Sequence, residues 1–320
     1  MVLSVEKSTE RDMLISWIIP CFNEGEVIQA TFRRVNKVCD LHSMYKWEII
    51  FVDDGSRDNT QEIVKSLINT KSRVKFIVLS RNYGHQIAVQ AGLNNSIGNA
   101  AIIIDADLQD PPELASSLLR KWEEGFDVVY GKRVERKAES LFKKLTAKLF
   151  YRLMNHLADI DIPLDTGDFR LIDRKVIEAT KEMPEKERFL RGMISWIGFN
   201  QTYINYTREK RYAGRTKYPL SKMLKFATDG IISFSRRPLK LATYIGFISS
   251  IVSLLGIIYV LYIRLLTNNW VAGWAGLALA VLFSCGLQLL SIGILGEYIG
   301  RIYVESKNRP LYFVKERIEL

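Results

Sequence analysis

The chain has 320 residues, of which 48% are hydrophobic and 25% are charged, and its formal net charge is +10. This charged fraction is ordinary for a folded protein, which excludes a disordered chain and a transporter with many membrane spans. The cysteines, Cys21, Cys39 and Cys285, lie far apart without zinc-binding spacing, so we expect neither a zinc site nor a disulfide framework. The N-terminus lacks an apolar segment, and we expect no signal peptide.

Short runs of β-branched residues alternate with helical stretches through the first part of the chain. This alternation is typical of βαβ units and predicts an α/β domain with a mostly parallel sheet. Two helix starts carry local signals: Asp58 with Gln61 resembles a capping box, and Asp110 is expected to cap the helix after it. The expected strands are Leu14–Ile19, Glu48–Asp53, Val74–Ser80, Ala100–Asp105 and Asp127–Gly131.

Polar and small residues follow each expected strand. In open α/β sheets, ligands bind at the carboxyl ends of the strands, so five such loops predict one binding crevice. The loops are Pro20–Glu24, Asp53–Ser56, Arg81–His85, Asp105–Gln109 and Gly131–Arg133.

Carboxylates in these loops are the candidate ligands for a cation and a nucleotide. Asp105 and Asp107, two residues apart at a strand end, can both approach a divalent cation that bridges a diphosphate. Asp53 and Asp54 are either turn residues or acceptors for a base or a ribose, and His85 is either a structural histidine or a phosphate contact. A dinucleotide oxidoreductase and a P-loop ATPase are excluded because their glycine-rich motifs are missing.

Basic segments precede the apolar part of the chain. Residues 208–240 carry ten Lys or Arg against two acidic residues, a position that favours an anionic membrane surface or lipid phosphates. No nucleic-acid-binding motif accompanies this charge, so we expect no nucleic-acid partner. Residues 139–158 and 219–235 are amphipathic and basic, which is typical of interfacial helices, although packing on the protein's own core is equally open for the first.

Two uncharged runs, at 241–263 and 274–296, are each long enough to cross a membrane. Between Leu241 and Gly296 the single charged residue is Arg264, whereas several Lys and Arg lie beyond the outer ends of both runs. The positive-inside rule therefore places both termini in the cytoplasm, with a short external loop. The alternative is a pair of buried helices in a soluble core.

Four motifs follow the expected strands: IIPCFNE at Ile18–Glu24, VDDGSRDNT at Val52–Thr60, RNYGHQIAVQAG at Arg81–Gly92 and DADLQDPPE at Asp105–Glu113. With them the chain resembles inverting family 2 glycosyltransferases, which implies the Rossmann-like GT-A fold. Two more motifs, DTGDFRLIDR at 165–174 and RYAGRTKYPL at 211–220, and the two apolar runs narrow the resemblance. The chain is most similar to polyprenyl-phosphate glycosyltransferases of the GtrB-type bactoprenol glucosyltransferase branch, with dolichol-phosphate mannose synthases as more distant relatives.

The resemblance covers the chain from Met13 to its end and implies its division. Residues 1–12 would be an N-terminal extension, 13–207 the cytoplasmic catalytic domain and 208–240 a basic juxtamembrane segment. Residues 241–296 would form two transmembrane helices, and 297–320 a cytoplasmic tail.

The resemblance also implies roles for site residues. The nucleotide sugar would be held by Pro20, Asn23, Glu24, Asp53, Asp54, Arg81 and Asp105, and the metal by Asp105, Asp107 and Gln109. Asp168 would be the catalytic residue, with Asp165 as second candidate, and Arg133, Arg170, Arg211 and Lys217 would hold phosphate or acceptor.

The role of Asp168 has three readings. The second pKa of a phosphate monoester is about 6, so the acceptor is largely dianionic at neutral pH and hardly needs a base. We therefore expect Asp168 to orient groups or to stabilise positive charge at the anomeric carbon, rather than to act as a general base. The third reading is a structural aspartate that pairs with Arg170 or caps a helix.

The activity implied by the resemblance is transfer of glucose from UDP-glucose to undecaprenyl phosphate, at the cytoplasmic face of the bacterial inner membrane. A divalent cation, Mg²⁺ or Mn²⁺, would neutralise the departing UDP. The resemblance also implies a homo-oligomer, a tetramer, and small residues in the second apolar run allow close helix contacts. The alternatives are another donor (GDP-mannose, UDP-aminoarabinose or a UDP-N-acetylhexosamine), a non-catalytic nucleotide-sugar-binding membrane subunit, or a subunit of a lipid-carrier flippase.

Overall fold

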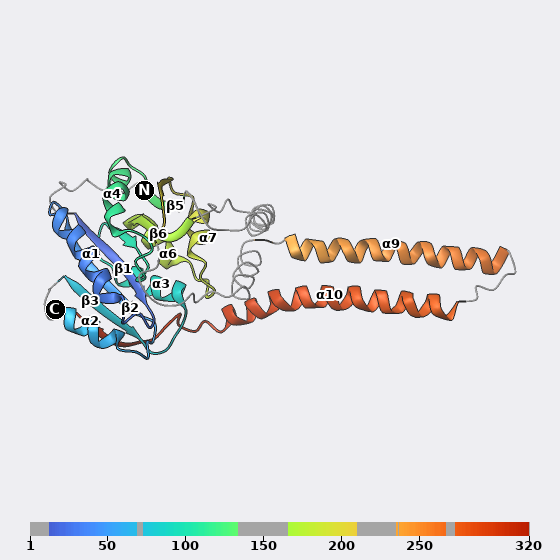
Figure 1. Cartoon of the computed structure of the whole chain (residues 1–320). Helices are drawn as coiled ribbons and strands as arrows, with labels where there is room; N and C mark the ends of the chain where they lie inside the picture. Colours follow the sequence, from blue (N-terminus) through green and yellow to red (C-terminus); the bar gives the residue numbers. More distant parts are fainter. Residues whose placement is uncertain are drawn as a thin grey trace. The chain divides into compact units, whose positions relative to one another are not determined.

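We describe a computed structural model of the chain, which places residues 13–68, 73–133, 166–209, 235, 237–266 and 273–319. These residues form two compact units. The first unit contains the sheet and includes residues 310–319, and the second contains two long helices between 235 and 309 (Figure 1).

Four parallel strands form the centre of the sheet. Nearly all of their residues are buried, because helices cover both faces. The register pairs Cys21 with Asp53, so the first two strands end side by side and their loops emerge together, as expected. The strands are β1 (Leu14–Cys21), β2 (Lys46–Asp53), β3 (Val74–Leu79) and β4 (Ala100–Ile103).

Four outer strands extend this centre into a mixed sheet with the order β7-β5-β6-β4-β1-β2-β3-β8. β6 runs antiparallel between β4 and β5, and β8 runs antiparallel to β3. The mostly parallel α/β sheet and its five predicted strands are confirmed, whereas β6, β7 and β8 were not predicted. The outer strands are β5 (Val128–Arg133), β6 (Thr166–Asp173), β7 (Gln201–Tyr206) and β8 (Val314–Ile318).

Helices pack on both faces of the sheet. Apolar side chains of α1 (Ile28–Leu41), α2 (Thr60–Ile68) and α4 (Ala115–Glu123) share one core with Trp17 and Phe51. Side chains alternate along a strand, so Ile18 and Val52 point to the opposite face. There α3 (His85–Asn95) lies so close that a Cβ on its Gly92 would overlap Ile18 and lie 3.2 Å from Val52. This close approach fixes α3, and with it the loop at its start.

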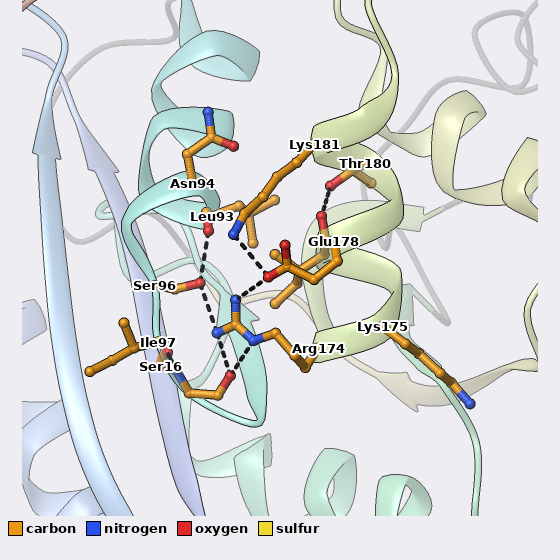
Figure 2. A network of polar contacts seen from close by, with 12 residues as sticks. Ser16, Leu93, Asn94, Ser96, Ile97, Arg174, Lys175, Glu178, Thr180 and Lys181 are labelled. Atoms are coloured by element: carbon orange, nitrogen blue, oxygen red, sulfur yellow. Dashed lines mark hydrogen bonds and ion pairs between the residues drawn. The ribbon is translucent and has the colours of Figure 1, made fainter. Parts of the chain in front are cut away.

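Two further helices, α6 (Arg174–Glu182) and α7 (Leu190–Ile197), continue the α3 face. Arg174, the first residue of α6, anchors that helix to the turn before β4 (Figure 2). Its Nε donates to the carbonyl of Gly98 at 2.7 Å, and its Nη1 donates to Glu178 at 3.1 Å. The network therefore fixes the end of β6 beside the start of β4.

The second unit is a helical hairpin. α9 (Arg237–Leu266) and α10 (Trp274–Ser306) run side by side in Figure 1, and each contains a 27-residue stretch apolar enough to span a membrane. The most apolar windows have mean hydropathies of 2.2 and 1.6, and neither is buried within the described part of the chain. The two predicted apolar helices are confirmed, and their exposure argues against burial in a soluble core.

The predicted tail differs from what is observed. α10 continues past Gly296 to Ser306, because no proline or helix-ending glycine interrupts it before Asn308 and Pro310. The following residues then form β8 in the sheet of the first unit. The sequence segments 1–12, 139–158 and 219–234, together with Asp165, Arg211 and Lys217, lie outside the described residues.

Candidate functional site

The loops that follow β1 and β2 are joined by hydrogen bonds. Asn23 N–H donates to Ser56 Oγ at 2.9 Å, and Asn23 Oδ1 accepts from the N–H of Arg57 at 2.8 Å. Glu24 N–H donates to Thr60 Oγ1 at 2.9 Å. Asn23 has a φ of 53°, a conformation that asparagine tolerates better than most residues. The first two loops therefore form one rigid wall.

Asp53 is completely buried at the end of β2. Its Oδ2 accepts from Ser56 N–H at 3.0 Å and from Gln61 Nε2 at 2.7 Å. Its Oδ1 has no hydrogen-bond partner among the described residues. The predicted capping box is wrong, because Asp58 accepts from Thr60 N–H while the Gln61 side chain turns to Asp53.

Asp54 holds the loop that follows β3. Its Oδ1 accepts from Tyr83 N–H at 2.7 Å, and its Oδ2 accepts from Gly84 N–H at 2.9 Å. Burial raises the pKa of Asp54, and the two backbone hydrogen bonds oppose that effect. Gly84 has a φ of 101°, which a residue with a side chain rarely adopts, and it caps α3. Both carboxylate oxygens of Asp54 are therefore engaged in positioning this loop.

A cavity of about 410 Å³ opens among these three loops, a volume typical of small-molecule sites. Arg57, Arg81 and Lys315 line it, and the described ranges hold no carboxylate ion-paired to any of the three. Arg81 lies over the ring of Tyr83, 4.1 Å from its centre. The cavity is lined by Phe22, Asn23, Gly55, Ser56, Arg57, Gln61, Leu79, Ser80, Arg81, Asn82 and Lys315.

The loop after β4 carries the predicted metal carboxylates. Asp107 is 8% exposed and accepts from Gln109 N–H at 3.1 Å, across a turn in which Leu108 has a φ of 57°. Asp105 Oδ1 is buried and accepts no hydrogen bond within the described ranges. Burial raises the pKa of Asp105 to about 6, with His85 opposing the shift and neighbouring carboxylates adding to it.

Asp168 of β6 lies beside this loop in a cluster of charged side chains. Arg191 Nε donates to its Oδ1 at 2.9 Å, and Gln86 Nε2 donates to its Oδ2 at 3.2 Å. His85 Nε2 lies 3.2 Å from Asp168 Oδ2 and 3.4 Å from Asp105 Oδ1. We call these residues, Asp105, Asp168, His85, Gln86 and Arg191, the histidine cluster.

For Asp168 and His85, attraction to the charged neighbours outweighs the cost of burial. Burial disfavours the charged form of Asp168, but Arg191 and His85 hold its pKa well below the usual range. Burial likewise lowers the pKa of His85, but Asp105 and Asp168 raise it to about 9. Near neutral pH, the imidazole is therefore a cation between two carboxylates, and Asp168 is an anion that binds protons poorly.

Asp110 lies on the next turn and is completely buried. It accepts a hydrogen bond from the Tyr206 hydroxyl, and its Oδ1 lies 3.9 Å from Arg133 and 3.6 Å from Arg208. The prediction that it caps a helix is wrong, because Pro111 stands at that position without a side-chain cap. Burial raises the pKa of Tyr206, which keeps the phenol a hydrogen-bond donor.

Arg170 and Arg133, expected to contact phosphate, lie on the neighbouring strands β6 and β5. Arg170 is 5% exposed and donates to the carbonyl of Gly167 at 2.9 Å, and burial lowers its pKa to about 10. Arg133 Nε donates to the Tyr206 hydroxyl at 3.2 Å. The expected alternative of an Asp168–Arg170 pair is not what the hydrogen bonds show, since Asp168 bonds to Arg191.

The structure gathers the predicted residues into two neighbouring groups. Pro20, Asn23, Glu24, Asp53, Asp54 and Arg81 belong to the ends of β1 to β3, and Asp105, Asp107, Gln109 and Asp168 belong to β4 and β6. Sequence reasoning missed Arg191, Gln86, Gln61 and Lys315. Gln86 stands inside a quoted motif, which was a usable signal. Arg191 is a lone charge on its helix, and Lys315 is one of three consecutive charged residues on β8, so neither carries a local pattern that indicates a site.

The side chains near Asp105 show whether this site can hold the divalent cation that the resemblance implies. Among the described residues, no three His, Cys, Asp or Glu side chains lie close enough together to hold a metal ion by themselves. Asp105 and Asp107 nevertheless provide hard oxygen ligands, and one oxygen of Asp105 is buried without a hydrogen bond. These residues fit a divalent cation that takes its remaining ligands from diphosphate oxygens.

Comparisons with known proteins agree with this geometry. Residues 16–180 match the model of glycosyl transferase family 2, and residues 237–302 match the model of the GtrB C-terminal hairpin. The chain is 50% identical to the uncharacterized glycosyltransferase YkcC of Bacillus subtilis, over 96% of this chain and 94% of that protein.

Two further relatives cover nearly the whole chain. An uncharacterized glycosyltransferase of Synechocystis is 45% identical, over 94% of this chain and 95% of that protein. The bactoprenol glucosyl transferase of Shigella phage SfV is 41% identical, over 95% and 98% respectively. The resemblance inferred from the motifs is confirmed, including the GtrB-type branch.

The histidine cluster predicts a pH dependence of stability. The pKa of His85 is raised in the folded state from an unfolded value of about 6.5, so its contribution is complete below that pH and is lost as the pH rises through about 9. We expect the free energy of unfolding of the metal-free protein to fall by about 2 kcal/mol between pH 6.5 and 9. Thermal unfolding of wild type and His85→Gln in detergent with EDTA measures this. The variant should lack this part of the loss, and identical pH profiles would contradict the assignment.

Proposed function

The chain belongs to glycosyl transferase family 2, and from this membership we propose that it transfers glucose from UDP-glucose to undecaprenyl phosphate with inversion of the anomeric carbon. Relatives named bactoprenol glucosyl transferase support the reaction and the prenyl phosphate acceptor. One observation carries the proposal: a cavity of about 410 Å³ and a partly buried carboxylate cluster lie at the strand ends of one sheet, in a chain that also carries an apolar hairpin.

The cavity at β1 to β3 is the proposed site of the nucleoside. Asp53 is hydrogen-bonded to the cavity residues Ser56 and Gln61, and its other oxygen has no partner among the described residues, so it can accept a hydrogen bond from a base N–H or a ribose hydroxyl. Arg57 and Arg81 supply positive charge that suits an anionic nucleotide. The loops are fixed by hydrogen bonds before the donor arrives, which reduces the ordering cost of binding.

The diphosphate would extend from this cavity to Asp105 and Asp107. A Mg²⁺ or Mn²⁺ ion held by Asp105, Asp107 and Gln109 would neutralise charge on the departing UDP. The two carboxylates need such a cation nearby, because unshielded they would repel the diphosphate. Protonated His85 already lowers the negative charge around Asp105.

The reaction is a single displacement. A phosphate oxygen of the acceptor attacks the anomeric carbon, the new carbon–oxygen bond forms as the bond to the diphosphate breaks, and UDP leaves with that electron pair. Asp168 is held anionic by Arg191 and His85, so it can stabilise positive charge at the anomeric carbon or orient the sugar. The acceptor needs no base because its phosphate is already an anion.

The acceptor phosphate would be held by cations. Arg133 and Arg208, which lie near Asp110, are two such cations. We propose that Arg211 and Lys217 also contact the acceptor phosphate. Arg170 is buried and bonded to the backbone, so we assign it the role of holding β6, and with it Asp168, in place. Arginine and lysine suit a phosphate as a planar fork and a point charge respectively.

The hairpin would bring the enzyme to its lipid. We propose that α9 and α10 cross the bacterial inner membrane with the catalytic domain in the cytoplasm, following the positive-inside bias. Small residues in α10 support a homo-oligomer, and the resemblance favours a tetramer. A non-catalytic nucleotide-sugar-binding subunit is the alternative, which would bind the donor but show no turnover.

A donor panel tests the proposed function. Purified protein is incubated with undecaprenyl phosphate, Mg²⁺ or Mn²⁺, and UDP-glucose, GDP-mannose, UDP-N-acetylglucosamine or UDP-aminoarabinose, and the lipid product is read by mass. We expect a hexosyl phospholipid from UDP-glucose. A product from another donor alone would reassign the sugar, and nucleotide binding without product from any donor would favour the non-catalytic subunit.

Removal of a metal carboxylate should stop transfer. Asp107→Asn keeps the shape of the side chain but removes its charge, and we expect a rate loss of at least about 10²-fold. EDTA should have the same effect on wild type, reversed by added Mg²⁺ or Mn²⁺. The matched control is Asp40→Asn, which removes a carboxylate paired with Arg73 at the surface. Near-normal turnover of Asp107→Asn at saturating metal would contradict the assignment.

The role of Asp168 is separable by pH. If Asp168 acts electrostatically, the Asp168→Asn variant should transfer sugar about 10²-fold more slowly than wild type. This difference in rate should stay constant between about pH 6.5 and 8.5, because the acceptor phosphate is already an anion over that range. A general base would give a loss that diminishes as the acceptor becomes fully dianionic. The measurement is a pH–rate comparison with wild type at saturating donor. If the rate of the variant approaches that of wild type at high pH, Asp168 acts as a general base and the electrostatic role is contradicted.

A further inference from the structure

The edge strand β8 contributes one side chain, that of Lys315, to the lining of the nucleotide cavity. β8 pairs with β3 so that Val78 faces Glu316 and Leu79 faces Val314. Lys315 is therefore the extra residue of a β-bulge, a feature that redirects a side chain relative to a regular strand. Lys315 lines the cavity together with Leu79 and Ser80 of the neighbouring strand end.

Contacts with three elements fix β8 in this register. Ser80 N–H donates to the carbonyl of Phe313 at 2.9 Å, immediately before the bulge. Glu316 forms an ion pair with Lys65 of α2 at 2.7 Å. Tyr312 accepts from the side-chain amide of Asn94 of α3 at 3.2 Å. The strand is thus a bound part of the sheet rather than a loose end, and Lys315 has a defined place at the cavity.

The positive charge around the cavity favours binding of an anion. Lys315 adds a third cation to Arg57 and Arg81, and within the described ranges no carboxylate forms an ion pair with any of them. The side chain of Lys315 is exposed to solvent, so its ammonium is free to move toward a bound ligand. A lysine is a compact point charge on a flexible stem, which suits an anionic oxygen approached from the side.

We propose that Lys315 is a nucleotide-binding residue, whose ammonium contacts an anionic oxygen of the donor's α-phosphate, the phosphate next to the nucleoside. This inference rests on the proposed function. It implies that the donor site is completed by the segment that follows the apolar hairpin, since α10 ends at Ser306 and β8 begins at Val314. Donor affinity then depends on correct pairing of β8 with β3.

Direct binding of UDP tests the inference without acceptor or turnover. Lys315→Met keeps the length of the stem and removes the charge, and we expect the Kd for UDP to rise about tenfold, as for loss of a charge-assisted contact. Lys315→Arg should stay within about threefold of wild type. The matched control is Arg317→Met, which removes one charge from the same strand at a residue bonded to Asn95, outside the cavity.

The outcomes separate this inference from the proposed function. Weaker UDP binding by Lys315→Met, with Arg317→Met and Lys315→Arg near wild type, supports the role of Lys315. Equal weakening by both methionine variants, or none by Lys315→Met, overturns that role while leaving the proposed function intact. Failure of the wild type to bind UDP or GDP overturns both. In transfer assays, Lys315→Met should raise KM for the donor and leave kcat nearly unchanged.

Discussion

The two hydrogen bonds that Asp54 accepts from the N–H groups of Tyr83 and Gly84 connect the two halves of the site. A buried carboxylate that accepts two backbone N–H groups fixes both the position and the direction of the loop it holds. The residues just before that pair, Arg81 and its neighbours, form a wall of the nucleotide cavity, and the residue just after it is His85. Displacement of this loop would therefore disturb the cavity and the histidine cluster together.

Charge is divided between the two halves in a way that suits the proposed chemistry. The cavity has three cations without carboxylate partners in the described residues, so it favours the anionic nucleotide. The neighbouring half is rich in carboxylates, and there Arg191 and His85 keep Asp168 charged despite burial. An enzyme that separates an anionic leaving group from a sugar with cationic character benefits from both environments, and the sheet places them side by side.

Sequence reasoning succeeded where the signal was local and failed where it depended on distant partners. The five predicted strands are short buried runs, and their loops follow directly, so the local pattern sufficed to place the loops that carry most of the candidate residues. β8 was missed because Val314–Ile318 is short and charged, and its place is set by pairing with β3. Asp110 carries a local capping pattern, yet a hydrogen bond from the distant Tyr206 determines its role. Arg191 carries no local pattern at all, and only the fold brings it to Asp168.

The central claim is that one crevice holds the donor, with the nucleoside at the ends of β1 to β3 and the diphosphate extending from there to the loop after β4. The most direct measurement is a cryo-electron microscopy map of the protein in lipid nanodiscs with UDP-glucose and a divalent cation, using Asp168→Asn to slow turnover. The account predicts base and ribose density among Asp53, Arg57 and Arg81, with diphosphate density against Asp105 and Asp107. Nucleotide density at any other place on the chain, with this cavity empty, would contradict it.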